Sequence, residues 1–168
     1  EAMGIAAGLG NSPFQSRLLY YSERSVDVFD LFAASFGGTD RLVRVLGTQA
    51  GNSWTASQVL AHNNAHQSCD ALAIAPYFGP HITNANVMQF VGMSGDGLLD
   101  YVEAISVPIT VARIHANANV ARSFGLPMIA YEGGQHIAAS VASTYRAQIT
   151  SLMISANRNQ RMHGIYGK

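Results

Sequence analysis

The chain has 168 residues, of which 48% are hydrophobic and 12% are charged, whereas about 25% of residues are charged in an average globular domain. Ten basic and ten acidic residues give a formal net charge of zero. This balance argues against electrostatic binding to nucleic acid or to an anionic membrane. The length predicts a single domain over residues 1–168, and the scarcity of charge predicts faces that pack against another surface.

The first predicted element is a long helix that begins near Ser12. Ser12 can cap the helix, Pro13 suits the first helical position, and Gln15 completes a capping box. Apolar residues then recur at close to helical spacing. Gly37 and Gly38 predict the end of this helix.

Three short apolar segments predict β-strands, and helical segments separate them. The strands are expected at residues 41–48, 71–75 and 128–130, the last of them buried. A long loop is expected from Pro76 to Gly97. The other helices are expected from Ser53 or Thr55 to about His66, over residues 98–105 and 109–124 with a break near Pro108, and over residues 144–161.

The predicted order is αβαβαβα, which indicates an α/β fold with a parallel sheet. Three strands are few for such a sheet, since sheets average about five or six. A closed barrel of this type needs about 250 residues. The chain is therefore either a small three-layer domain or a partial (β/α) barrel, and its low charge favours the partial barrel.

Polar or aromatic side chains follow each predicted strand. The carboxyl ends of parallel strands lie at one edge of a sheet, where ligands bind, so these side chains are expected to share one rim. Trp54 lies close by in the sequence and could stack on a sugar or pack at a helix start. The side chains at the predicted rim are Gln49, Asn52, Tyr77, His81, Tyr131, Glu132, Gln135 and His136.

Glu132 is the candidate of greatest chemical interest, because a carboxylate at the end of an apolar strand can act in catalysis. Gly133 and Gly134 follow it and allow a sharp turn with room for a ligand. The alternative is a structural carboxylate that hydrogen-bonds a loop. Both interpretations are open at the level of the residues alone.

The single cysteine and a pair of histidines are two further candidate sites. Cys69 is the only cysteine, which excludes an internal disulfide and favours a buried structural thiol. His62 and His66 are four residues apart, a spacing that places two metal ligands on one helix face. Asn63 stands where the zinc protease motif has its glutamate, so a metal-binding protein is an alternative without that general base. No cofactor is expected.

Three segments resemble a known family. Residues 41–49, 71–79 and 128–136, the last containing Tyr-Glu-Gly-Gly-Gln-His, look like the fifth, sixth and seventh βα units of retaining (β/α)8-barrel glycoside hydrolases of the cellulase-like, β-glycan-acting clan. Residues 20–29 are similar to the helix before the fifth strand. The resemblance covers nearly all of the chain but only about half of the family's barrel.

The resemblance implies that Glu132 is the nucleophile of a retaining glycosidase and that Tyr77 contacts it. His81, Trp54 and His136 would line sugar subsites. The family's acid/base glutamate follows an asparagine, and no Asn-Glu pair occurs in this sequence. Retaining hydrolysis needs two carboxyl groups about 5–5.5 Å apart, so one partner of the pair is missing.

The expected function is hydrolysis of a β-linked oligo- or polysaccharide, and the alternative is a non-catalytic carbohydrate-binding remnant. An open half-barrel would expose strand edges and apolar faces. A homodimer or higher oligomer is therefore expected, in which two halves complete a barrel-like core. The sequence leaves the compartment unknown, and a glycosidase of this kind would be secreted or periplasmic.

Overall fold

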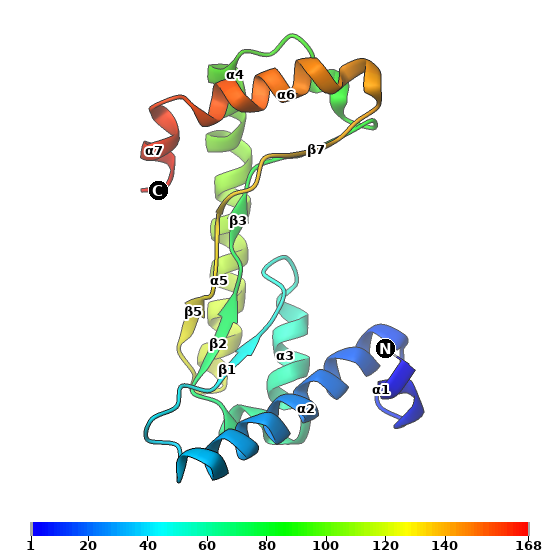
Figure 1. Cartoon of the computed structure of the whole chain (residues 1–168), viewed down its shortest axis with the longest axis vertical. Helices are drawn as coiled ribbons and strands as arrows, with labels where there is room; N and C mark the ends of the chain where they lie inside the picture. The colour runs from blue at the N-terminus through cyan, green and yellow to red at the C-terminus, as the bar shows by residue number, and fades with distance from the viewer. Residues whose placement is uncertain (1, 168) are drawn as a thin grey trace. The chain divides into compact units, whose positions relative to one another are not determined.

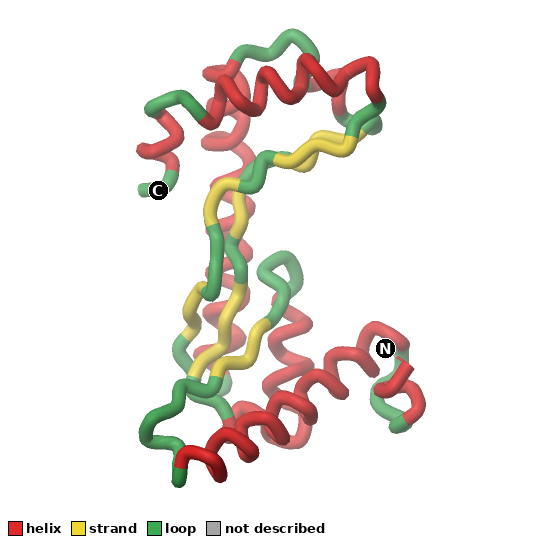
Figure 2. Tube along the Cα trace, in the orientation of Figure 1, coloured by secondary structure: helices red, strands yellow, loops and turns green. Residues whose placement is uncertain are grey.

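The computed structural model describes residues 2–167, and it is a mixed α/β protein with short parallel strands (Figures 1 and 2). Its contacts divide the chain into two compact units. The first unit comprises Glu1–Ala75 and Arg113–Glu132, and the second comprises Pro76–Ala112 and Gly133–Lys168. The expectation of one cooperative domain over residues 1–168 stays a prediction.

The first unit is built from helices around a small sheet. Its elements are α1 (Ala2–Ala6), α2 (Pro13–Phe36), β1 (Val45–Gly47), α3 (Ser53–Ala61), the 3-10 segment η1 (His62–Ser68), β2 (Ala71–Ile74), most of α5 (Val107–Ser123) and β5 (Met128–Ala130).

The second unit contains short strand pairs and a helical core. Its elements are β3 (Tyr77–Phe78), β4 (His81–Thr83), η2 (Val87–Gln89), α4 (Gly95–Tyr101), η3 (Val102–Ser106), the start of α5, β6 (Gly134–Gln135), β7 (Ala138–Ser140), α6 (Ser143–Asn157) and α7 (Arg161–Ile165).

The sheet of the first unit has the order β1-β2-β5, and both pairs are parallel. The prediction of three parallel strands separated by helices is confirmed, although β1 is shorter than residues 41–48. Leu46, Leu72 and Met128 lie in one row of the register. They pack with side chains of α3 and α5, including Leu60 and Ala121, to form the core of this unit.

The strand β5 is largely exposed, whereas the sequence predicted a buried strand. Ile129 is 43% exposed, and Tyr131, directly after the strand, is 60% exposed. β5 pairs with β2 on one side and with no other strand among the described residues. An outer strand keeps one edge open, which explains why its apolar sequence does not produce burial.

The long helix α2 forms where the sequence predicts it. The Ser12 hydroxyl accepts a hydrogen bond from the Gln15 N–H at 3.2 Å, and Gly37 ends the helix with a φ of +75°. The capping box is displaced by one residue. The Gln15 side chain accepts from the Asn11 N–H at 2.7 Å, where a standard box would use the N–H of the cap residue.

The helix expected to run to His66 ends at Ala61 instead. Asn63 and Asn64 have φ values of +48° and +57°, and two successive left-handed residues cannot continue a right-handed helix. Asparagine tolerates this conformation better than most residues, because its short side chain can hydrogen-bond locally. The chain therefore passes from α3 into the 3-10 segment η1.

The helix break expected near Pro108 is absent. α4, η3 and α5 follow one another with helical backbone at the junction residues Tyr101, Val102 and Val107. η3 is a π-helical turn, in which the Val107 N–H donates to the Val102 carbonyl. This wider turn directly precedes Pro108, whose missing N–H and bulky ring would disrupt regular α-helical bonding.

The long loop expected from Pro76 to Gly97 contains two strands and a 3-10 turn. β3 pairs with β6, and β4 pairs with β7, both in parallel. These strands have two or three residues each. Segments that short cannot show the alternation by which a strand is recognised in a sequence.

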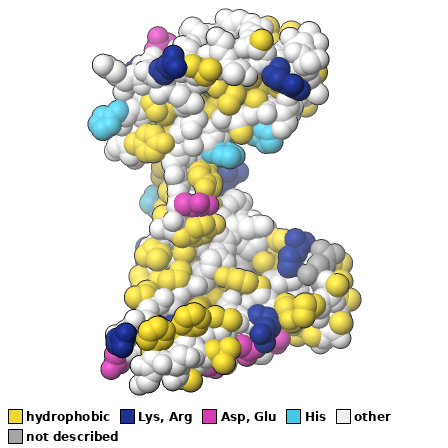
Figure 3. All heavy atoms as spheres, in the orientation of Figure 1, with side chains coloured by type: hydrophobic (Ala, Val, Ile, Leu, Met, Phe, Trp, Pro, Cys, Tyr) yellow, Lys and Arg dark blue, Asp and Glu magenta, His cyan; other side chains and the backbone are white. Residues whose placement is uncertain are grey.

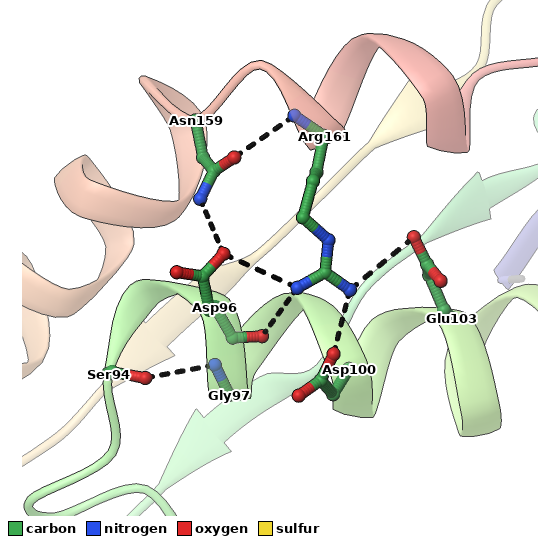
Figure 4. Close-up of polar contacts among 7 residues, drawn as sticks. All are labelled: Ser94, Asp96, Gly97, Asp100, Glu103, Asn159 and Arg161. Atoms are coloured by element: carbon green, nitrogen blue, oxygen red, sulfur yellow. Dashed lines mark hydrogen bonds and ion pairs between the residues drawn. The ribbon is translucent and has the colours of Figure 1, made fainter.

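The helices of the second unit enclose its core, in which Leu98, Leu99, Ile149 and Leu152 are buried. The helix predicted over residues 144–161 corresponds to α6, which ends at Asn157. Arg161 opens α7, and its guanidinium contacts three carboxylates of α4 and η3 (Figure 4). The distances are 2.7 Å to Asp100, 3.3 Å to Asp96 and 3.7 Å to Glu103.

Asp70 and Arg44 join the starts of β2 and β1. The Asp70 carboxylate accepts from the Arg44 backbone N–H at 2.7 Å and from its guanidinium at 2.7 and 3.1 Å. The guanidinium bonds, followed by the backbone bond, hold the pKa of Asp70 below its usual range. The stabilisation is therefore present above about pH 4, the usual pKa of aspartate, and is lost as the pH falls through the lowered pKa.

Asp70→Asn is expected to reduce the free energy of unfolding by about 1 kcal/mol at neutral pH, a value that allows for solvent screening of this partly exposed pair. The deficit should disappear in acid, where the wild-type carboxylate is also protonated. Urea denaturation at neutral and acidic pH measures both effects. Asp27→Asn is the control, because its pair with Arg24 has side chains that are 55% and 54% exposed and contributes little. An equal deficit at both pH values would contradict the assignment.

Candidate functional site

A pocket of about 550 Å³ lies at the carboxyl edge of the sheet in the first unit. Residues that follow β1, β2 and β5 contribute to its wall, and the other side of the wall belongs to α2. Apolar groups make up most of this surface. The lining residues are Arg17, Leu18, Tyr21, Gly47, Thr48, Gln49, Ala50, Ala75 and Tyr131.

Two hydroxyl groups define the polar character of the pocket. The Tyr21 hydroxyl accepts a hydrogen bond from the Gly47 N–H at 2.9 Å. The Thr48 hydroxyl is buried and has no hydrogen-bond partner among residues 2–167. A buried polar group without a partner costs about 1–3 kcal/mol, so this hydroxyl lowers the stability of the first unit slightly.

Glu132 follows β5 at the same edge of the sheet, two residues after Ala130. Its side chain is exposed, and within the described part of the first unit no hydrogen bond or ion pair engages its carboxylate. The interpretation of Glu132 as a structural carboxylate required such a bond. A carboxylate that is exposed and makes no such bond can instead contact a substrate.

Asn52 and Trp54 lie at the start of α3. The Asn52 side chain accepts from the Trp54 N–H at 3.2 Å and so caps the helix. Trp54 is 41% exposed, and its ring stacks on Phe14 with 5.9 Å between ring centroids. The structure therefore gives Asn52 a local structural role, while Trp54 combines packing on one side with an exposed aromatic surface.

The other four predicted site residues belong to the second unit. β3 and β6 place Tyr77 opposite Gly134, and the rings of Tyr77 and His136 lie 5.2 Å apart. The Gln135 amide nitrogen is buried without a hydrogen-bond partner in the described range 2–167. His81 on β4 lies 3.2 Å from the Ser140 hydroxyl. The structure thus groups Gln49, Tyr131 and Glu132 at one sheet edge, and Tyr77 with His136 in a second cluster.

His62 and His66 do not share a helix face, because α3 ends before them. The His62 Nε2 lies 3.0 Å from the Glu23 carboxylate, and the His66 Nδ1 lies 3.1 Å from the Leu60 carbonyl. Among residues 2–167, no group of three or more histidine, cysteine, aspartate or glutamate side chains could hold a metal ion. The geometric premise of a two-histidine metal site is therefore wrong.

Cys69 is buried, as the sequence predicts. Burial, assisted by the negative charge of Asp70, raises the pKa of its thiol to about 11. Since the thiolate is the reactive form of cysteine, this residue is unreactive at neutral pH. Its place is in the apolar core of the first unit.

Sequence patterns did not indicate Arg17, Tyr21 or Thr48 as site residues. Arg17 and Tyr21 lie in the middle of a helical pattern, which gives no sign that they belong to a site. Their spacing of four residues does place both on one face of α2. That this face lies against β1 follows only from tertiary packing.

Comparisons of the chain with protein-family models, with curated proteins and with solved structures found no match. No helix within residues 2–167 has the length and apolar character needed to cross a bilayer.

Proposed function

We propose that this chain is a partial (β/α) barrel that acts on a β-linked glycan, with Glu132 as the nucleophile. The observation that carries the proposal is the position of Glu132. It is exposed, it follows β5 at the carboxyl edge of a parallel sheet, and Tyr131 beside it lines a pocket of about 550 Å³. Ligands of open α/β sheets bind at this edge.

In this proposal, the Glu132 carboxylate attacks the anomeric carbon of the sugar and the bond to the leaving oxygen breaks. A glycosyl ester forms on Glu132, and water then hydrolyses it. Gln49 and Tyr131 contact the substrate from the same edge. Trp54, in the same unit, offers its exposed ring as a further sugar contact. Asn52 caps the start of α3 and thereby positions Trp54, without contacting the sugar itself.

The second carboxyl group of a retaining mechanism has no candidate at this edge of the first unit. Asp70 bonds Arg44, and Glu23 bonds His62. Asp40 precedes β1 and so lies toward the opposite end of the strands. Within the described part of the first unit, Glu132 thus has no acid/base partner. The leaving group must then depart without protonation by a neighbouring carboxyl.

This deficit defines the test. Dinitrophenolate is a good leaving group that needs no protonation, so a dinitrophenyl β-glycoside should react with Glu132 even without an acid. Attack of water on the ester should be slow, because no general base assists it. We expect a rapid release of about one equivalent of dinitrophenolate followed by slow turnover, and a glycosylated Glu132-containing peptide in mass spectrometry.

The second candidate function is glycan binding without hydrolysis. The missing second carboxylate favours it, as does the exposed face of Trp54. It predicts that calorimetry detects a β-linked oligosaccharide while the dinitrophenyl glycoside gives no burst and no labelled peptide. Those two measurements separate the candidates.

A further inference from the structure

Both outer strands of the three-stranded sheet have an open edge. β1 and β5 each pair with β2 and with no other strand in the described residues. Open edges carry unpaired backbone groups that can receive a strand from another chain. Since all three strands are parallel, the β5 edge of one copy has the polarity needed to continue the sheet at the β1 edge of another.

Two apolar hollows, together named the groove, lie between α2 and the chain from residue 42 to residue 50. At the carboxyl end of β1, the groove is the pocket already described, with Leu18 and Tyr21 on α2. Before the amino end of β1, a second hollow of about 300 Å³ lies between Val28, Phe29 and Phe32 of α2 and Leu42, Val43 and Arg44 of the loop. Figure 3 shows hydrophobic side chains along this helix.

The backbone of β1 confirms which of its edges is open. The Thr48 N–H donates to the Ala73 carbonyl of β2, so the N–H of the preceding residue points to the other side, because successive amides of a strand alternate. That amide, Gly47, donates to the Tyr21 hydroxyl. This amide therefore already has a partner, and a strand carbonyl from a second copy would take the place of the Tyr21 hydroxyl as its acceptor.

The strand β5 has the properties of an occupant for this groove. Ile129 and Tyr131 expose apolar surface of the size the groove can bury, 43% and 60% of each residue. Glu132 follows them as an anion, and the cation Arg17 lines the carboxyl end of the groove. A parallel approach brings these opposite charges to the same end of the paired strands.

From these observations we infer that the groove between α2 and β1 receives the β5 edge of a second copy of this chain, as a parallel continuation of the sheet. Burial of Ile129 and Val43, the latter 74% exposed, removes apolar surface from water and so favours association. Each copy has one donor edge and one acceptor groove, so the contact is head-to-tail. It forms a ring where the rotation between copies closes and a filament where it does not.

The pairing has a consequence for the proposed glycan site, and this consequence rests on the proposed function. Glu132 of the partner subunit would enter the edge where Gln49 and Thr48 lie. The site would then be shared between two copies. Association itself depends only on the strand edges, so it can be tested without a substrate.

The test uses cysteine pairs in a Cys69→Ala background. Val45 and Ile129 lie on the same face of the sheet, because Val45 aligns with Ala71 and Ile129 with Ala73. Copies carrying Val45→Cys are mixed with copies carrying Ile129→Cys and exposed to oxidised glutathione. Disulfides need Cα atoms within about 7 Å, so Val43→Cys serves as a second rung for a shifted register. We expect the mixed disulfide to exceed either self-disulfide at least tenfold.

Ile154→Cys is the matched control, since Ile154 is an exposed isoleucine of α6 in the second unit, and its mixture with Val45→Cys should give no product.

Light scattering of the wild type should give at least twice 17.9 kDa, and Ile129→Lys should be monomeric with unchanged circular dichroism. A wild-type monomer, a dominant Val45→Cys self-disulfide, or an oligomer unaffected by Ile129→Lys would each overturn the inference. Cross-linking and light scattering are measured without any glycoside, so their outcome is separate from the fate of the glycan proposal.

Discussion

Glu132→Gln is expected to abolish the burst and the turnover of dinitrophenyl β-glycosides, with a loss of at least about a thousandfold. Glutamine keeps the size of the side chain but cannot act as an anionic nucleophile, and removing the nucleophile of a covalent mechanism causes losses on this scale or larger. Stopped-flow absorbance of released dinitrophenolate gives the burst, and intact-protein mass gives the labelled fraction.

Glu103→Gln is the control for this variant. Glu103 lies on η3 in the second unit, and its carboxylate is 3.7 Å from Arg161, so its loss should leave the burst unchanged. Azide added to Glu132→Ala should restore release of dinitrophenolate, because the small anion can attack the anomeric carbon in the vacated space. Wild-type kinetics in Glu132→Gln would exclude Glu132 as the nucleophile.

Leu72→Ala is expected to lower the free energy of unfolding by about 2–5 kcal/mol, because truncation of a buried leucine loses apolar burial and leaves a cavity. Leu72 is fully buried in the central strand β2 and aligns with Leu46 on one side and Met128 on the other. A loss of this size is a large fraction of the stability of a typical domain. Urea denaturation followed by circular dichroism measures it.

Two further variants complete this experiment. Met88→Ala changes a side chain that is 68% exposed and should alter the free energy by less than about 0.5 kcal/mol. Leu99→Ala removes a fully buried leucine from the second unit. If residues 1–168 form the single domain expected from the sequence, Leu72→Ala and Leu99→Ala should shift one common transition. Two transitions that respond separately would contradict that expectation.

The parts of the fold that could be predicted are those with strong local signals. Ser12, Pro13 and Gly37 define the ends of α2 through chemistry that acts within a few residues. β2 and β5 are recognised as strands because each is an apolar run next to a proline, Pro76 after β2 and Pro127 before β5. Their parallel order follows from the helices between them.

The remaining features depend on contacts or backbone states that leave little trace in the sequence. The left-handed backbone of Asn63 and Asn64 has no clear signal in the sequence, so the helix was expected to continue and to place His62 and His66 on one face. The π turn before Pro108 replaces an expected break. In the site, Glu132 was found from its strand, but Tyr21 and Thr48 acquire their positions only when α2 packs beside β1.

The last helix limits how the protein can be engineered. Gly134 has a φ of +109°, and a β-carbon there would lie 2.8 Å from the ring of Tyr166. The Tyr166 hydroxyl also accepts from the Gln135 N–H at 3.0 Å, so this tyrosine shapes the turn that begins two residues after Glu132. A truncation that removes α7 together with Tyr166 would therefore disturb that turn.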